Sequence, residues 1–127
     1  MAQITEDYVS FETAKLLKEK GFDAKCKKYY NLKMLTNLYY GCEYVRNRDL
    51  KDEDDCIAPS LGMAMKWLRE VHKLHVDVDP SEGDWNPTVI TLEDWACAVK
   101  FGDNRPIQDS YEKACEAAIK YCLENLI

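Results

Sequence analysis

The feature that most constrains the fold is a change of hydrophobic period near residue 73. Between residues 61 and 73, apolar side chains recur at the 3.6-residue spacing of a helix. From Leu74 to Asp79, apolar and polar residues alternate, which is the period of a strand. The change marks a helix that leads into a strand, and we therefore expect an α+β fold.

The helix predicted over residues 61–73 has two adjacent apolar stripes. The first consists of Leu61, Ala64, Met65, Leu68, His72 and His75, and the second of Met63, Trp67 and Val71. The charged residues on the remaining face are Lys66, Arg69, Glu70 and Lys73. A helix that is apolar over more than half of its circumference is expected to lie deep in the domain.

The rest of the second half predicts two more strands and a closing helix. The elements expected in order are a turn-rich loop over 80–87, a strand over 88–92, a turn at Glu93–Asp94 and a strand over 95–101. The last helix is expected to have Asp109 as its N-cap, because Glu112 follows three residues later as in a capping box. Residues 58–127 thus predict an α-β-β-β-α unit, a small three-stranded antiparallel sheet packed against two helices on one face.

Residues 1–57 predict an extra N-terminal helix followed by a tyrosine-rich segment. Ser10 can cap a helix over Phe11–Lys20, and Gly21 can end it. The tyrosines that crowd the next stretch are Tyr29, Tyr30, Tyr39, Tyr40 and Tyr44. The charged run 51–55 is expected to be an exposed loop. We expect this half to wrap the second, so that residues 1–127 form a single domain.

The charge and the cysteines indicate a soluble, cytoplasmic protein. The net charge of -6 disfavours binding to a phosphate backbone, because that affinity comes from cations. The lysines that lie close together are Lys18, Lys20, Lys25, Lys27 and Lys28, which we interpret as a solvated surface, with a basic patch as the alternative. The six cysteines form no close pair and follow no secretion signal, so we expect reduced cysteines in the core. No apolar run approaches the roughly 20 residues of a membrane span.

The polar residues predict no metal, cofactor or catalytic site. Zinc could be held by His72, His75 and Cys56, but the chain has no C-x-x-C pair. We interpret His72 as a histidine whose ring nitrogens are hydrogen-bonded beside the core. The acidic segment from Asp77 lacks the glycine and the glutamate that a calcium loop requires. The acids directly before Cys56 would raise the pKa of its thiol, which disfavours a nucleophile. We therefore predict that the protein is not an enzyme.

Three short motifs carry a resemblance to a known family. They are Ala58-Pro59-Ser60, Trp67-Leu68-Arg69-Glu70, and Tyr111-Glu112-Lys113-Ala114 in the last helix. In these motifs the chain resembles a family of small uncharacterised proteins from gut bacteria and their phages and prophages, and the stretch Thr13–Phe22 fits as well. The resemblance implies a small α+β fold and brings no known activity.

The α-β-β-β-α order of residues 59–126 is also similar to that of double-stranded-RNA-binding domains. That family places a basic K-K-x-x-K cluster at the start of its last helix, where it reaches phosphates. In this chain the same place holds Ser110–Lys113, with one lysine beside an acid. The departure removes the main reason to infer RNA binding from the topology.

Two function hypotheses follow. The first is a non-enzymatic accessory protein of phage or prophage type that binds another protein, since Tyr and Trp often anchor interfaces. The alternative is a nucleic-acid-binding module of double-stranded-RNA-binding-like topology. An exposed aromatic patch would favour the first hypothesis, and an exposed lysine cluster the second. The candidate binding residues are Arg69, Glu70, His72, Tyr39 and Tyr40, although the tyrosines can equally serve in core and rim packing. The oligomeric state stays open.

Overall fold

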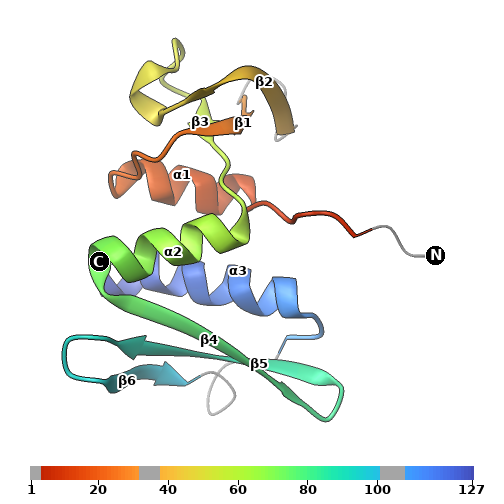
Figure 1. Ribbon diagram of the computed structural model, residues 1–127, viewed down its shortest axis with the longest axis vertical. Coiled ribbons are helices and arrows are strands. Elements are labelled where there is room, and N and C mark those ends of the chain that lie inside the picture. Colours follow the sequence, from red (N-terminus) through yellow and green to blue (C-terminus); the bar gives the residue numbers. More distant parts are fainter. Residues whose placement is uncertain (1–3, 32–37, 101–107) are drawn as a thin grey trace. The chain divides into compact units, whose positions relative to one another are not determined.

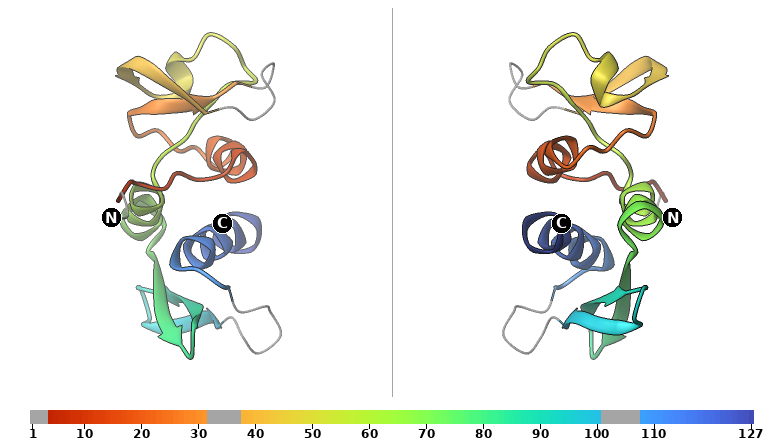
Figure 2. Two further views of the ribbon diagram at one scale, coloured as in Figure 1. Left: turned by 90° about the vertical axis from the view of Figure 1, so that its right-hand side faces the viewer. Right: turned by 90° about the vertical axis from the view of Figure 1, so that its left-hand side faces the viewer.

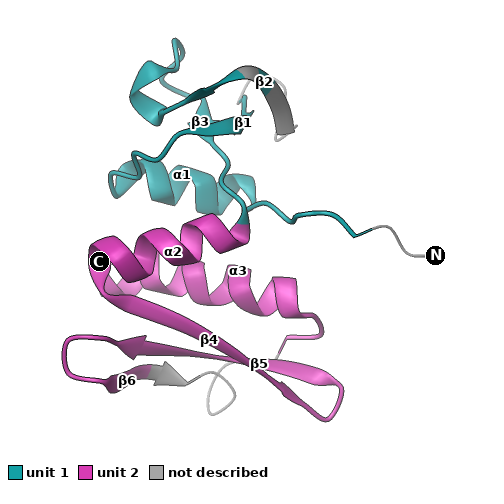
Figure 3. Cartoon of the chain, in the orientation of Figure 1, with its two compact units in different colours: residues 1–60 teal, residues 61–127 magenta. Residues whose placement is uncertain are grey.

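The computed structural model describes residues 4–31, 38–100 and 108–127, without the side chains of residues 38–40, 42, 99 and 100 (Figure 1). The described residues form three α-helices and two three-stranded antiparallel sheets, which confirms the α+β fold. They group into two compact units, residues 1–60 and 61–127 (Figure 3). That both units belong to a single domain stays a prediction. None of the described helices is long and apolar enough to span a membrane.

The second unit has the predicted α-β-β-β-α order. Its elements are α2 (Leu61–His72), β4 (Leu74–Ser81), β5 (Asp84–Thr91), β6 (Ala96–Lys100) and α3 (Tyr111–Tyr121), with a π-helical turn (Cys122–Leu126) at the end. The strands pair in the order β4-β5-β6, and α2 and α3 cover one face of this sheet (Figure 1, Figure 2). Each strand pairs with the next along the chain, so short connections are sufficient.

The core of the second unit lies between its sheet and its two helices. Val76 of β4 pairs with Val89 of β5, and both side chains are buried. Leu68 of α2 and Ile119 of α3 are fully buried as well. Along the first half of β4, buried and partly exposed residues alternate, as expected for a sheet with one packed face.

The prediction that α2 lies deep in the domain is wrong, because one of its two apolar stripes is largely exposed. Leu61, Ala64 and Leu68 of the first stripe are buried as predicted. Met63 and Val71 of the second stripe are 40% and 57% exposed. Within its unit α2 contacts β4 and α3, and these two neighbours cover a single stripe. The helix is therefore amphipathic, with an apolar strip left at the surface.

The segment predicted as a turn-rich loop over 80–87 is mostly strand. β4 and β5 continue into a hairpin in which Pro80 pairs with Trp85. The turn is only two residues long, Glu82 and Gly83, and their positive φ values of 47° and 91° are typical of a type I′ turn. A proline is tolerated in β4 because β4 is an edge strand.

Helix α3 begins one residue later than predicted. Ser110 is the N-cap instead of Asp109, and its Oγ accepts a hydrogen bond from the backbone N–H of Lys113 at 3.1 Å. Asp109 forms an ion pair with Nζ of Lys113, with an N–O distance of 3.0 Å. Both residues can cap a helix, and the extended backbone at Ser110 places that residue in the capping position.

The first unit contains a sheet that the sequence did not predict. Its elements are α1 (Phe11–Glu19), β1 (Cys26–Tyr30), β2 (Leu38–Val45), a 3-10 turn (Asn47–Asp49) and β3 (Cys56–Ile57). The strands pair antiparallel in the order β2-β1-β3. The predicted helix is confirmed, because Ser10 Oγ accepts from the N–H of Thr13 and Gly21 follows the helix with a φ of 88°.

Buried hydrogen bonds hold the first unit together. The hydroxyl of Tyr30 donates to the carbonyl of Val9 at 2.7 Å. The side-chain amide of Asn47 donates to the carbonyl of Phe22 at 3.0 Å and accepts from the N–H of Ile57 at 2.8 Å. These bonds join segments that lie far apart in the sequence, which local patterns cannot reveal.

The charged run 51–55 is exposed or half-exposed as predicted, with one exception. Asp55 is buried, because the chain turns inward there to enter β3. The ammonium of Lys18 donates to the carbonyl oxygens of Glu53 and Asp55 at 2.5 and 2.7 Å. The end of this loop is therefore tied to α1.

Candidate functional site

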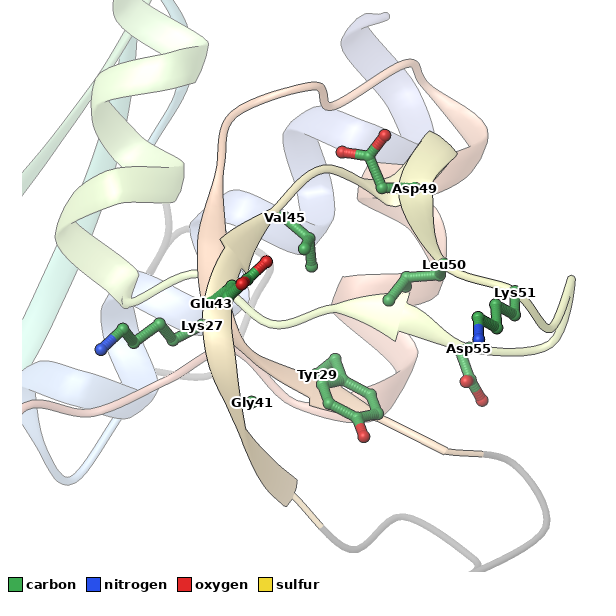
Figure 4. Close-up of a pocket in the computed structure, with 9 residues that line it drawn as sticks. All are labelled: Lys27, Tyr29, Gly41, Glu43, Val45, Asp49, Leu50, Lys51 and Asp55. Carbon is green, nitrogen blue, oxygen red and sulfur yellow. The ribbon is translucent and has the colours of Figure 1, made fainter.

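A concave pocket of about 550 Å³ lies on one face of the sheet of the first unit (Figure 4). Its lining residues are Lys27, Tyr29, Gly41, Glu43, Val45, Asp49, Leu50, Lys51 and Asp55. The contributions from β1 and β2 are alternate residues, as expected for one face of a pleated sheet. The even-numbered residues Cys26 and Tyr30 of β1 are buried instead. The sheet thus has one packed face and one hollowed face.

Gly41 lets β1 and β2 approach closely beneath this pocket. A Cβ atom at this position would lie 2.9 Å from the carbonyl oxygen of Lys27, so a larger residue would push the strands apart. In Figure 4, Tyr29, Val45 and Leu50 surround the hollow, and the charged side chains stand around its rim. This size and mixed lining can receive a small polar ligand or one side chain of a partner.

The charges of the pocket do not form a catalytic arrangement. The lining includes two lysines and three acids, one of them the buried Asp55, spread over β1, β2 and the segment 49–55. No nucleophile with an adjacent base is found among its lining residues. In the part of the chain that the structure describes, no group of three potential metal ligands occurs.

The predicted site residues of α2 do not converge. Arg69 Nε lies 3.9 Å from Glu70 Oε1 in an ion pair whose two side chains are substantially exposed. The ring of His72 instead packs against Trp67, with a centroid distance of 4.6 Å. His72 Nε2 is buried and finds no hydrogen-bond partner among the described residues, which contradicts the predicted satisfied histidine. These residues therefore provide a surface ion pair and a packed ring, without a shared site.

The predicted tyrosine candidates lie in the first unit. Tyr39 and Tyr40 belong to β2, where they pair with Tyr29 and Lys28 of β1. Their side chains lie outside the described part of the structure, so their role as binding residues stays a prediction. Tyr44, further along β2, is 64% exposed.

Three of the clustered lysines make contacts within the first unit. Besides the two hydrogen bonds of Lys18, the ammonium of Lys27 lies 5.0 Å from the ring centre of Tyr44. The ammonium of Lys28 lies 4.0 Å from the ring centre of Tyr8. These contacts direct the lysines toward separate neighbours. The arrangement gives little support to a basic patch.

The buried cysteines have the properties of core residues. Burial raises the pKa of Cys56 to about 11, and neighbouring Lys18 and Asp55 shift that pKa in opposite directions. A thiol that stays protonated at neutral pH is a poor nucleophile. Cys97 does not fit the prediction of core cysteines, since it is exposed on β6. None of the described cysteines forms a disulfide.

The β5–β6 turn presents a tryptophan that sequence reasoning placed incorrectly. Trp95 was predicted in the third strand, but it lies in the turn before β6 and is 80% exposed. Its φ of 58° is in the left-handed region, which bulky residues rarely adopt. The alternation of residues 95–101 gave no signal of this turn conformation.

Hydrogen bonds around Asp94 fix the conformation of this turn. The Asp94 carboxylate accepts from the hydroxyl of Thr91 and from the N–H of Ala96, the latter at 3.3 Å. The hydrogen bond from Thr91 is the main cause of a lowered pKa of Asp94. Trp95 lies between these bonded residues, so its backbone is held while its indole remains in solvent. We define Leu92–Trp95 as the Trp95 turn.

Comparisons with protein-family models, with curated proteins and with solved structures found no match. The Trp95 turn presents one exposed aromatic side chain, and its backbone is held by hydrogen bonds to Asp94. The pocket of the first unit is lined by both acidic and basic residues. Of the two, the turn has the clearer physical reason to bind a partner, because an exposed indole leaves apolar area in water.

Proposed function

We propose that this protein is a non-enzymatic accessory protein that binds another protein through the Trp95 turn. The observation that carries the proposal is the 80% exposure of Trp95 in a turn fixed by Asp94. Tryptophan is among the residues most enriched at the energetic centres of protein interfaces. The resemblance to small phage and prophage proteins supplies the biological setting of the proposal.

The energetics of an exposed indole support this function. Burying a tryptophan removes about 150–250 Å² from water, which corresponds to roughly 3–5 kcal/mol at the exposure seen here. Because the turn is already ordered by its hydrogen bonds, little backbone entropy remains to be lost on binding. Association itself costs about 4–15 kcal/mol, so the partner must add further contacts around this anchor.

The alternative nucleic-acid function has less support. The α-β-β-β-α order is present, but the lysine at the start of α3 is paired with Asp109. Residues 61–127 carry seven Lys and Arg against twelve Asp and Glu, a formal net charge of −5. A unit with this charge repels a phosphate backbone at long range.

The proposal is tested by comparing the proteins that wild type and variants retain from an extract of the native host. Trp95→Ala should lose a specific partner that wild type retains. Val71→Ala removes another exposed apolar side chain, on α2, and should retain the partner. Recovery of the same proteins by wild type and Trp95→Ala would show that the turn is not the binding site.

A further inference from the structure

The two edges of the sheet in the second unit differ in their protection against a further strand. Edge strand β4 carries Asp77, Asp79 and Pro80, and charges and prolines are the features that discourage edge pairing. β6 is the other edge of this sheet, and its charged residue is Lys100 at the far end. It begins with Ala96, Cys97 and Ala98. These three small, uncharged residues are all exposed. The start of β6, next to Trp95 in the chain, thus lacks the charges and the proline that protect β4.

The less protected edge adjoins the exposed tryptophan. Trp95 directly precedes β6, so a strand added to β6 would run past the Trp95 turn. In the described part of the chain β6 pairs with β5 alone, which leaves one side of its backbone for another strand. Backbone hydrogen bonds along the strand would then act together with one aromatic anchor, which is the arrangement of β-strand addition.

The charge around this edge favours a cationic occupant. Glu93 and Asp94 of the Trp95 turn are exposed acids that directly precede Trp95 in the chain. The unit as a whole has a formal net charge of −5, from seven Lys and Arg against twelve Asp and Glu. A second copy would bring the same charge, whereas a Lys- or Arg-bearing segment would be attracted and could also stack on the indole.

We propose that β6 and the Trp95 turn dock an extended segment of a partner protein that carries Lys or Arg, added to the sheet as a fourth strand. This inference rests on the proposed function and names the chemistry of its partner. It predicts three dependences of binding: on the indole, on positive charge in the segment, and on the backbone N–H groups of that segment.

The probe is a fluorescein-labelled peptide of alternating Lys and Val, about seven residues long, titrated against the full-length protein by fluorescence polarisation. A peptide with Glu in place of Lys and a peptide with N-methylated backbone should each bind at least about tenfold more weakly. The peptide comparison uses wild-type protein, so it does not depend on the folding of any variant.

Protein variants then locate the site. Trp95→Ala should weaken binding of the Lys/Val peptide by about tenfold or more, and Val71→Ala should leave it within about twofold. The inference would be overturned if the Glu peptide or the N-methylated peptide bound as tightly as the Lys/Val peptide. A dimer in sedimentation that Trp95→Ala dissociates would also overturn it, since the occupant would be a second copy. If the host partner depends on Trp95 but the peptide does not bind, the inference fails and the proposed function stands.

Discussion

At the scale of single residues, Asn47 shows how one buried amide joins three segments of the first unit. Its side chain bonds to Phe22, before β1, and to Ile57 of β3. Asn47→Ala leaves a buried carbonyl and a buried N–H without partners, and each is expected to cost about 1–3 kcal/mol. Denaturant melts should show this loss, and Arg48→Ala, which changes an exposed neighbour, should change stability by less than about 0.5 kcal/mol. If both variants changed the free energy of unfolding equally little, water would have to satisfy the Phe22 carbonyl and the Ile57 N–H in place of the amide.

Leu68 and Glu70 offer a second comparison within one helix. Leu68 is fully buried, so Leu68→Ala should leave a cavity and cost about 2–5 kcal/mol. Glu70 is exposed, and its ion pair with Arg69 is a surface contact, so Glu70→Ala should cost no more than about 0.5 kcal/mol. Denaturant melts of the two variants check this order. Greater damage from Glu70→Ala would show that its carboxylate belongs to a buried polar network.

At the scale of elements, a substitution in the Trp95 turn should remove partner binding without lowering the stability of the protein. Left-handed backbone costs a bulky residue about 1–2 kcal/mol, whereas glycine adopts it freely at an entropic cost of about 0.5–1 kcal/mol. Because Trp95 is 80% exposed, Trp95→Gly loses little packing. We expect the variant to be as stable as wild type or up to about 1 kcal/mol more stable in thermal or denaturant melts, and to lose partner binding. A clear loss of stability would show that the indole packs on its own unit.

The elements that the sequence predicted are those with a long local period. α1 and α3 have capping residues, all three helices have apolar stripes, and β4 shows alternation, so each is visible within one segment. The sheet β2-β1-β3 was missed because β3 has two residues and its pairing with β1 joins positions far apart in the chain. The Trp95 turn was missed because the alternation of bulky and small residues over 95–101 includes residue 95. In the structure, hydrogen bonds to Asp94 hold residue 95 in a turn, and β6 begins only at Ala96.

At the scale of the whole molecule, the charge is divided unequally. Of the net charge of -6, residues 1–60 contribute −1, from ten Lys and Arg against eleven Asp and Glu, and residues 61–127 contribute −5. We expect no specific binding of duplex RNA or DNA, with any Kd weaker than about 1 μM at physiological salt. A polarisation titration with labelled duplexes checks this. Tighter binding would favour the nucleic-acid alternative.

The buried thiols predict how the stability of both units depends on alkaline pH. Burial raises the pKa of Cys26 and Cys56 in the first unit to about 11, and that of Cys122 in the second to about 12. In the unfolded chain these thiols ionise near pH 9.0. Below that pH both states keep their protons, and the full stability is present. Above it the unfolded state releases protons first, so the free energy of unfolding falls as the pH rises toward the folded pKa.

The contribution of Cys122 can be isolated by comparing slopes. Each buried thiol should lower the free energy of unfolding by up to about 1.4 kcal/mol per pH unit between pH 9 and its folded pKa. Cys122→Ala should be less stable than wild type at pH 7, because the substitution leaves a cavity. Since the variant lacks one titrating thiol, its free energy of unfolding should fall less steeply from pH 9 to 10. Cys97→Ala, which removes an exposed thiol, is the matched control variant. Denaturant melts at several pH values measure these slopes. A Cys122→Ala curve parallel to wild type would show that this thiol ionises equally in the folded and unfolded states, and that the packing around α3 admits water.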